Sequence, residues 1–181
     1  DIEARVGDLK DKAAKSHFRQ LVREEAWDIE PDWSRPLVFE ANRYPVPAGS
    51  RYNGRYQFNK RFYPVQADLK DGGEEFFCAQ LLDNHAKVKY WVRNLTTAPC
   101  GFGLATSKGH FYPDFVAELL DGRIAVIEYK GAHLVNDPYE IEKRLVGELG
   151  ARKSDGRCVF GQITKDRNGV GTSGQLDALL T

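Results

Sequence analysis

Methionine is absent from this 181-residue sequence, which begins at Asp1. We therefore expect the chain to be a segment of a longer protein. Cysteine is scarce: Cys78, Cys100 and Cys158 are odd in number and far apart, which argues against a disulfide framework and against a cysteine-rich zinc site. This pattern favours a reducing, cytoplasmic compartment.

Net charge is absent as well. Lys plus Arg and Asp plus Glu number 26 each, so the sequence has no polyanion-binding tail, and any attraction to nucleic acid must come from local clusters. No apolar run approaches the roughly 18 residues of a membrane span, and the N-terminus has no signal-peptide pattern, so we expect no membrane partner. Hydrophobic residues at 41% and charged residues at 29% indicate a globular domain long enough to bury a core.

Residues 1–49 predict a helix followed by a connector. Apolar residues recur at roughly helical spacing among dense charge from Ile2 to about Glu25, which predicts a solvated helix with one narrow apolar side. An extended loop is expected next, with prolines at Pro31, Pro36, Pro45 and Pro47. We interpret this part as a connector or packing helix that belongs to the larger parent protein.

Cations and aromatic residues interleave in RYNGRYQFNKRFYP, residues 51–64. Asn53-Gly54 is a strong signal for a two-residue turn and predicts a small basic hairpin. The mixture could hold phosphates while its rings stack on bases, with candidate contacts at Arg51, Arg55, Lys60 and Arg61. The alternative is a hairpin whose rings pack on the main domain while its cations stay in water.

A helix and a strand are predicted next. A helix over residues 74–83 places Glu75 on the same side as the apolar Cys78, Ala79 and Leu82. In KVKYWVRNL, residues 87–95, the alternation predicts a strand with one face that carries Lys87, Lys89, Trp91 and Arg93. This face could meet a phosphate backbone or only solvent. Residues 96–109, with Pro99 and three glycines, predict a loop.

The stretch from Phe111 to Gly131 carries the candidate chemistry. It places Asp114 directly after a proline and separates Glu128 from Lys130 by one residue, so Glu128 and Lys130 share a strand face. A carboxylate pair beside a lysine is what a divalent metal and an attacking water require.

The turn of this stretch decides whether the two acids meet. A two-residue Asp121-Gly122 turn would send Glu128 to the face opposite Asp114. A three-residue loop, with Gly122 in the left-handed conformation, pairs Asp114 with Glu128 instead. We predict the second register, because only this register lets both carboxylates reach one metal.

The remaining chain predicts a helix, a strand and a tail. Asp137 caps a helix that starts at Pro138 and buries Ile141, Leu145 and Leu149, while Lys143 and Glu148 are expected to face solvent or to be structural. RCVFGQIT, residues 157–164, predicts an internal strand. In the C-terminal tail, residues 166–181, we expect the GVGTSG stretch to be mobile and residues 175–180 to form a short helix. The element order predicts an α/β domain with a mixed central sheet flanked by helices.

This order, with an acid on the first helix, Pro-Asp on the second strand and Glu-Tyr-Lys on the third, resembles the PD-(D/E)XK nucleases. The run EEFFCAQLLD, KVKYWVRN, FYPDFVAEL, DGRIAVIEYKG and EKRLVGEL looks like the C-terminal endonuclease domain of type III restriction enzymes, in their helicase-bearing Res subunit. The resemblance covers about residues 50–165. It implies a restriction-endonuclease-like fold that hydrolyses DNA phosphodiester bonds with magnesium.

The resemblance implies roles for the central residues. Asp114 and Glu128 match the acids that bind Mg²⁺, for which Mn²⁺ would substitute, and the backbone carbonyl of Tyr129 would be a further ligand. Lys130 matches the lysine that orients or activates the attacking water and stabilises charge on the phosphate.

Outside this stretch, the resemblance implies two more site residues and several partners. Glu75 matches the helix-borne acid that completes the site, with Glu74 as the neighbour that could be mistaken for it, and Gln162 matches a polar accessory position. The implied partners are double-stranded DNA, the helicase region of the parent polypeptide and a modification or specificity subunit. ATP would act only through a helicase region that is not in this chain.

Other interpretations of these residues stay open. Glu128 and Lys130 could form an exposed ion pair, Asp114 could merely end a loop, and Glu75 could interact with its helix dipole. Apolar residues precede Glu128 and Lys130 on the same strand face, however, which is typical of the mouth of a pocket. At the level of function, the alternatives are a catalytically inactive nuclease-fold module that binds nucleic acid and a purely structural domain of a helicase.

Overall fold

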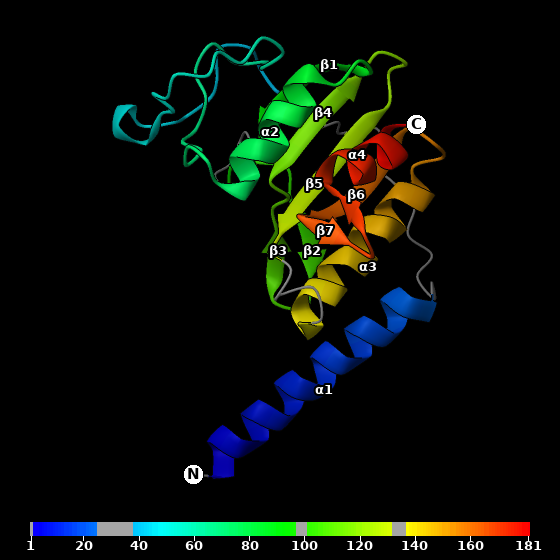
Figure 1. Cartoon of the computed structure of the whole chain (residues 1–181). Coiled ribbons are helices and arrows are strands. Elements are labelled where there is room, and N and C mark those ends of the chain that lie inside the picture. The colour runs from blue at the N-terminus through cyan, green and yellow to red at the C-terminus, as the bar shows by residue number, and fades with distance from the viewer. Residues whose placement is uncertain (1, 25–37, 97–100, 132–136) are drawn as a thin grey trace.

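The computed structural model of the chain describes residues 2–24, 38–96, 101–131 and 137–181, and its centre is a mixed four-stranded sheet (Figure 1). The strand order is β1 (Val88–Arg93), β4 (Phe115–Leu119), β5 (Ile124–Lys130) and β6 (Cys158–Thr164). The first three strands are antiparallel, whereas β5 and β6 are parallel. The predicted mixed sheet with flanking helices is therefore confirmed.

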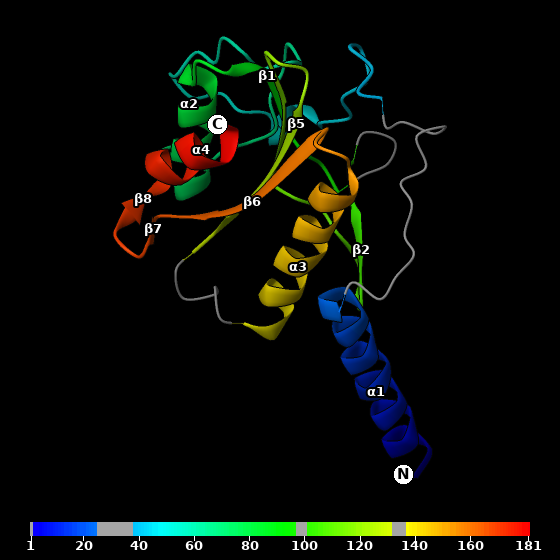
Figure 2. The same cartoon turned by 90° about the vertical axis from the view of Figure 1, so that its right-hand side faces the viewer.

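Helices cover both faces of this sheet (Figures 1 and 2). The helices are α1 (Ile2–Glu24), α2 (Glu74–Asn84), α3 (Pro138–Lys153) and α4 (Thr172–Leu180). The short elements are η1 (Ala48–Ser50), β2 (Leu104–Thr106), β3 (Gly109–Phe111), β7 (Asp166–Arg167) and β8 (Val170–Gly171). The strands β2 and β3 form a small hairpin that begins within the stretch predicted as a loop, so that prediction is wrong for residues 104–106 and for Gly109.

The main core lies between the sheet and the pair α2 and α4. Phe115 and Ile127 from the sheet and Leu82 from α2 have no exposed surface, and they join one apolar cluster with Leu176 and Leu180 of α4. The short helix predicted for residues 175–180 is therefore confirmed, and it begins earlier, at Thr172, within the stretch that was expected to be mobile. Because α4 contributes fully buried leucines, residues 172–180 are part of this core.

Strand β6 lies at the edge of the sheet, where the sequence predicted an internal strand. Its apolar composition has a different cause, because β6 contacts both α3 and α4 and so has a helix on each side. Gln175 of α4 secures the end of β6 through hydrogen bonds with the backbone N–H and C=O of Thr164, at 3.1 and 2.9 Å.

The hairpin of β4 and β5 has the predicted register. Phe115 pairs with Ile127 and Ala117 with Ala125, and the intervening loop is Leu120-Asp121-Gly122. Gly122 has a φ of 88°, in the left-handed region where glycine avoids a Cβ clash. This register continues to the position where Asp114 stands opposite Glu128.

Strand β1 departs from the predicted alternation. The pairing with β4 shifts between Val88 and Tyr90, as at a β-bulge, so both Val88 and Trp91 are buried while Tyr90 is 44% exposed. The predicted face of three cations and a tryptophan is therefore wrong. Trp91 lies in the core, where its indole N–H donates to Asp83 Oδ1 at 3.0 Å.

The predicted basic hairpin at Asn53-Gly54 does not form. Residues 51–67 contain two isolated bridges instead: Arg51 pairs with Ala67 within the segment, and Arg61 pairs with Trp91 of β1. Neither Asn53 nor Gly54 has the positive φ that the predicted turn needs. Phe58 and Tyr63 are buried instead, as in the alternative in which the rings pack on the domain.

Helix α3 begins as predicted, with the Asp137 side chain accepting hydrogen bonds from the N–H groups of Tyr139 and Glu140. Its buried residues differ from the predicted apolar stripe: they include the two acids Glu140 and Glu142, whereas Ile141 and Leu145 are only half-buried. Burial of two carboxylates on one helix requires cationic or hydrogen-bonding partners.

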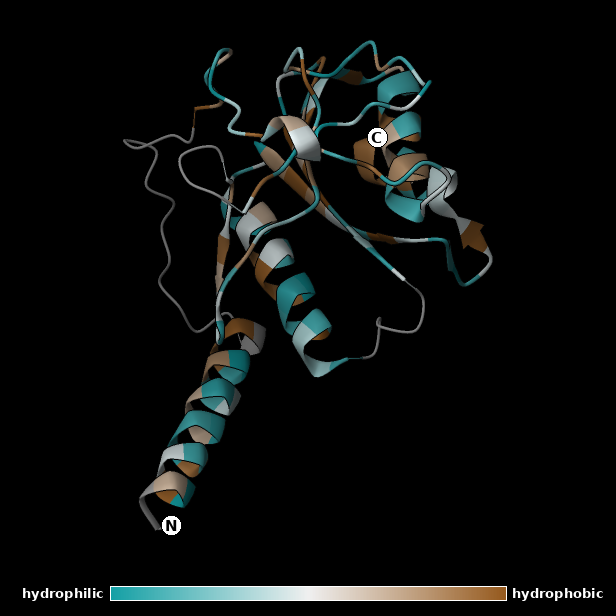
Figure 3. Cartoon of the chain, turned by 90° about the vertical axis from the view of Figure 1, so that its left-hand side faces the viewer, coloured by the Kyte–Doolittle hydropathy of each residue, from teal (hydrophilic) through white to brown (hydrophobic). Residues whose placement is uncertain are grey.

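The helix α1 is confirmed and extends away from the body of the protein (Figures 1 and 2). Figure 3 shows hydrophilic and hydrophobic residues mixed along it, and Val6 and Leu9 are 44% and 65% exposed. Its C-terminal end is attached through Arg19, whose Nε donates to Glu142 Oε2 at 2.7 Å. Glu142 also accepts from the backbone N–H and the hydroxyl of Ser107, at the tip of the β2–β3 hairpin.

None of the helices in the described ranges combines the length and the apolar character that crossing a membrane requires. Cys78 and Cys158 are free thiols, and Cys100 lies outside the described residues.

Candidate functional site

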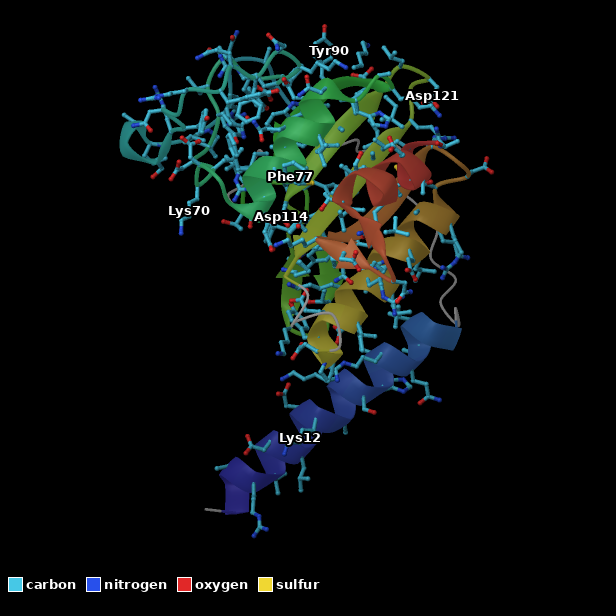
Figure 4. The ribbon with its side chains drawn as sticks, viewed as in Figure 1. Lys12, Lys70, Phe77, Tyr90, Asp114 and Asp121 are labelled. Carbon is cyan, nitrogen blue, oxygen red and sulfur yellow. The ribbon has the colours of Figure 1, made fainter. Side chains whose placement is uncertain are left out.

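Asp114 and Glu128 come together at one end of the β4–β5 hairpin. Asp114 directly precedes β4, and its Oδ2 accepts a hydrogen bond from the backbone N–H of Tyr129 at 2.7 Å. Glu128 lies opposite on β5 and is only 2% exposed. The sequence therefore placed both acids correctly, and Figure 4 shows Asp114 near one end of α2.

Glu128 belongs to a buried ring of alternating charge that we call the charge quartet, formed by Glu128, Lys130, Glu140 and Lys143. Lys130 Nζ is 2.7 Å from Glu128 Oε1 and 3.6 Å from Glu140 Oε2. Lys143 Nζ is 2.8 Å from Glu140 Oε1 and 3.8 Å from Glu128 Oε1. Each carboxylate thus faces both ammonium groups, which explains how α3 buries Glu140.

Burial and the charge of a neighbouring acid raise the pKa values of both Asp114 and Glu128. The pKa of Glu128 is raised to about 8, first by burial and then by the charge of Asp114, and the nearby Lys130 and Lys143 offset this only in part. The pKa of Asp114 is raised by burial and by the charge of Glu75, against the hydrogen bond from Tyr129. Two buried acids whose pKa values are both raised would gain from a shared cation.

Lys130 responds in the opposite sense. Burial alone would lower its pKa, but the contact with Glu128 and the charges of Glu140 and Asp114 outweigh burial and raise it. Lys130 is therefore held as an ammonium ion beside the acids.

Glu75 lies on the first turn of α2, on the side of Asp114, and its charge is felt by that carboxylate. Its side chain is 43% exposed, and its Oε2 is 2.6 Å from Arg93 NH1. Glu74 is exposed to solvent. The structure therefore associates Glu75 with the site, as predicted, and adds Arg93 as its partner.

A polar cleft of about 570 Å³ opens beside these residues. It is lined by Glu75 and Arg93 on one side and by Tyr129 and Lys130 on the other, with Lys70 at its rim. Acids and cations from three separate segments thus converge on one hollow that a phosphate could enter.

The residues present fit a divalent cation. Glu128 Oε2 is buried without a hydrogen-bond partner, so this oxygen is available to a cation. The N–H and C=O groups of one strand residue point to the same side of the strand. The N–H of Tyr129 donates to Asp114, so the Tyr129 carbonyl also points toward Asp114. Within the described residues, however, no three side chains of His, Cys, Asp or Glu are already gathered into a metal-binding group.

Gln162 is beside the site as predicted for an accessory residue. It pairs with Glu128 in the β5–β6 register and is 3% exposed. Its Nε2 donates to the backbone C=O of Glu140 at 3.3 Å, while its Oε1 is buried without a partner. Gln162 therefore connects β6 to the first turn of α3.

The cations predicted to contact nucleic acid are dispersed. Several are engaged within the protein: Arg51 with the Val46 carbonyl, Lys60 with the His85 carbonyl, Lys89 with Glu118, and Arg93 with Glu75. Arg55 and Lys87 are exposed and Arg61 is half-buried. Of the predicted set, only Arg93 lines the cleft.

Sequence reasoning missed three residues of the site. Lys143 was expected to face solvent or to be structural, yet its side chain is 14% exposed and lies in the charge quartet. Glu140 and Lys70 were not assigned to the site. The i and i+3 spacing of Glu140 and Lys143 on a predicted helix was the available signal for this pair.

Comparison of the chain with protein-family models, with curated proteins and with solved structures finds no match.

Proposed function

We propose that this chain is a nuclease domain that hydrolyses DNA phosphodiester bonds with Mg²⁺, for which Mn²⁺ substitutes. The observation that carries the proposal is the placement of Asp114 opposite Glu128, with Lys130 Nζ 2.7 Å from Glu128 Oε1 at the edge of a polar cleft. A role in hydrolysis of a phosphodiester explains this arrangement of two acids and one lysine better than a role as an ion pair at the protein surface does.

In the proposed reaction, Asp114, Glu128 and the Tyr129 carbonyl hold the cation, which would lower the pKa of a bound water and neutralise charge on the scissile phosphate. Lys130 supplies a further positive charge and orients the attacking water. Glu75 completes the acidic site, and Arg93 fixes Glu75 while facing the cleft. The cleft is the position proposed for the phosphate backbone.

We assign the domain, by resemblance, to the PD-(D/E)XK nucleases and to the endonuclease module of a type III restriction subunit. The α/β sheet with helices on both faces is compatible with a restriction-endonuclease-like fold. Double-stranded DNA is the proposed substrate, and the helicase region of the parent protein and a modification or specificity subunit are the proposed partners. A cytoplasmic location follows from this assignment.

A second candidate function is a catalytically inactive module that keeps the fold and binds nucleic acid. One observation favours it: Lys130 and Lys143 already neutralise Glu128, so the acids are not gathered around an open metal position. Binding of a cation distinguishes the two functions, because only the nuclease requires it.

The test combines metal binding with cleavage. Calorimetric titration of the 181-residue chain with Mn²⁺ is expected to show one site, which Asp114→Ala removes and Glu148→Gln, a change on the exposed part of α3, leaves intact. Cleavage of plasmid DNA by the parent protein with Mg²⁺ should fall by about 100-fold or more in Asp114→Ala and Lys130→Ala. Unchanged cleavage in both variants would refute the nuclease, and Mn²⁺ that fails to bind would support the inactive module.

A further inference from the structure

Glu140 has the same two neighbours as Glu128 but a different position in the protein. It lies on the first turn of α3, is 8% exposed, and faces Lys143 through Oε1 at 2.8 Å. Its backbone is fixed on both sides, since its N–H donates to Asp137 and its C=O accepts from Gln162. Glu140 is therefore a carboxylate anchored outside the β4–β5 hairpin.

One oxygen of Glu140 is not used. Oε2 is buried without a hydrogen-bond partner and lies 3.6 Å from Lys130 Nζ, beyond hydrogen-bond distance. A shift of Lys130 by under about 1 Å would complete that hydrogen bond. The charge quartet thus contains an acceptor that is prepared for an ammonium group but does not hold one in this state.

Lys143, the second lysine of the charge quartet, also has Glu140 as a partner besides Glu128. Lys143 Nζ is closer to Glu140 than to Glu128, by the distances 2.8 and 3.8 Å, and it lies over the rings of Tyr139 and Phe111. Lys143 therefore keeps most of its contacts when Glu128 is used for something else. A divalent cation at Glu128 would repel both ammonium groups strongly at these distances.

We propose that Glu140 is a positioning residue, the counter-charge that takes over Lys130 and Lys143 when Glu128 becomes a metal ligand. This inference rests on the proposed metal site. In this role Glu140 has two effects. It lowers the free-energy cost of separating Glu128 from the two lysines, and it keeps Lys130 beside the cleft. Without Glu140, both ammonium groups would stay on Glu128 and compete with the cation.

The experiment measures Mn²⁺ affinity by calorimetry on the whole 181-residue chain at one fixed pH. Glu140→Gln is expected to weaken binding roughly tenfold, as is usual for loss of a residue behind a metal ligand. Lys143→Gln is expected to strengthen it severalfold, because one competing cation is gone. Glu148→Gln, on the same helix and paired with Arg144 at the surface, is the matched control and should leave the affinity unchanged.

A double variant separates positioning from direct ligation. If Glu140 acts through the lysines, Glu140→Gln should cost much less affinity in the Lys143→Gln background than in the wild type. An equal loss in both backgrounds would show that Glu140 does not act through Lys143 and would overturn the inference. Glu140→Gln without effect would overturn it as well. Absence of Mn²⁺ binding in the wild type would instead overturn the proposed function and this inference with it, and circular dichroism of each variant identifies any loss of fold.

Discussion

Asp114 Oδ2 accepts the backbone N–H of Tyr129 at 2.7 Å, one residue beyond Glu128 on the neighbouring strand. This hydrogen bond fixes a carboxylate against the strand that carries the second acid, in a place where burial and Glu75 raise the pKa of Asp114. The two acids are thus brought together by backbone pairing and turn geometry, while their charges oppose the arrangement.

Gly122 should be important for that pairing. Its φ of 88° is unfavourable for residues with a Cβ, so Gly122→Ala is expected to destabilise the fold by about 1 kcal/mol. Gly150→Ala is the control, because Gly150 is inside α3 with nothing near its missing Cβ, and this change should stabilise by about 0.5–1 kcal/mol. Urea unfolding measures both changes, and equal effects would contradict the role of the loop.

The metal-free chain should lose stability as the pH rises. The pKa of Glu128 is about 8 in the folded chain and has its ordinary value in the unfolded chain. Between about pH 5 and pH 8, the folded chain therefore keeps a proton on Glu128 that the unfolded chain has released, so a rise in pH favours unfolding. Asp114 shifts in the same direction, whereas the raised pKa of Lys130 matters only at alkaline pH.

Urea midpoints in EDTA at pH 5, 6, 7 and 8 measure this slope. Glu128→Gln should flatten it, because the amide has no proton to release, and Glu148→Gln should leave it as in the wild type. A wild-type midpoint that rises across this range would contradict the raised pKa of Glu128.

Glu75 and Glu74 should differ although they are neighbours. Glu75→Gln removes a charge that raises the pKa of Asp114 and also releases Arg93, so the pKa of Asp114 should fall. Glu74→Gln, at an exposed position, should change it little. Carboxyl ¹³C titration by NMR follows Asp114 directly, and equal shifts in the two variants would assign the effect to general surface charge.

DNA binding should depend more on the cleft than on the basic aromatic segment. Lys70 lines the cleft, whereas Arg55 is exposed in the irregular segment and does not line it. Lys70→Ala is expected to weaken binding by several-fold and to reduce the slope of log K against log salt by about 1. Arg55→Ala should have the smaller effect, and the reverse order would move the DNA-binding surface to residues 51–64.

The sequence predicted those features that depend on local patterns. The start of α3 followed from Asp137 and Pro138, because helix caps are decided by a few adjacent residues. The turn residues Leu120-Asp121-Gly122 left two registers open for the β4–β5 hairpin, and the predicted register was chosen because only it lets Asp114 and Glu128 reach one metal. The structure has this register.

Features that depend on distant contacts were not predictable in this way. The bulge in β1 moves Trp91 into the core, where Asp83 of α2 accepts its N–H, and no periodicity of the strand alone indicates this. The Asn53-Gly54 signal was overridden because the neighbouring rings are buried against α2 and β1. Lys143 was not assigned to the site, since its contact with Glu128 joins residues that are distant in sequence.

Glu142 connects α1 mechanically to α3. This single buried carboxylate bonds Arg19 near one end of a 23-residue rod, about 35 Å long, and the tip of the β2–β3 hairpin at the same time. It is also two residues from Glu140 along α3. A sideways force on the exposed end of α1 is therefore transmitted through Glu142 to the part of α3 that carries Glu140 and Lys143 of the charge quartet.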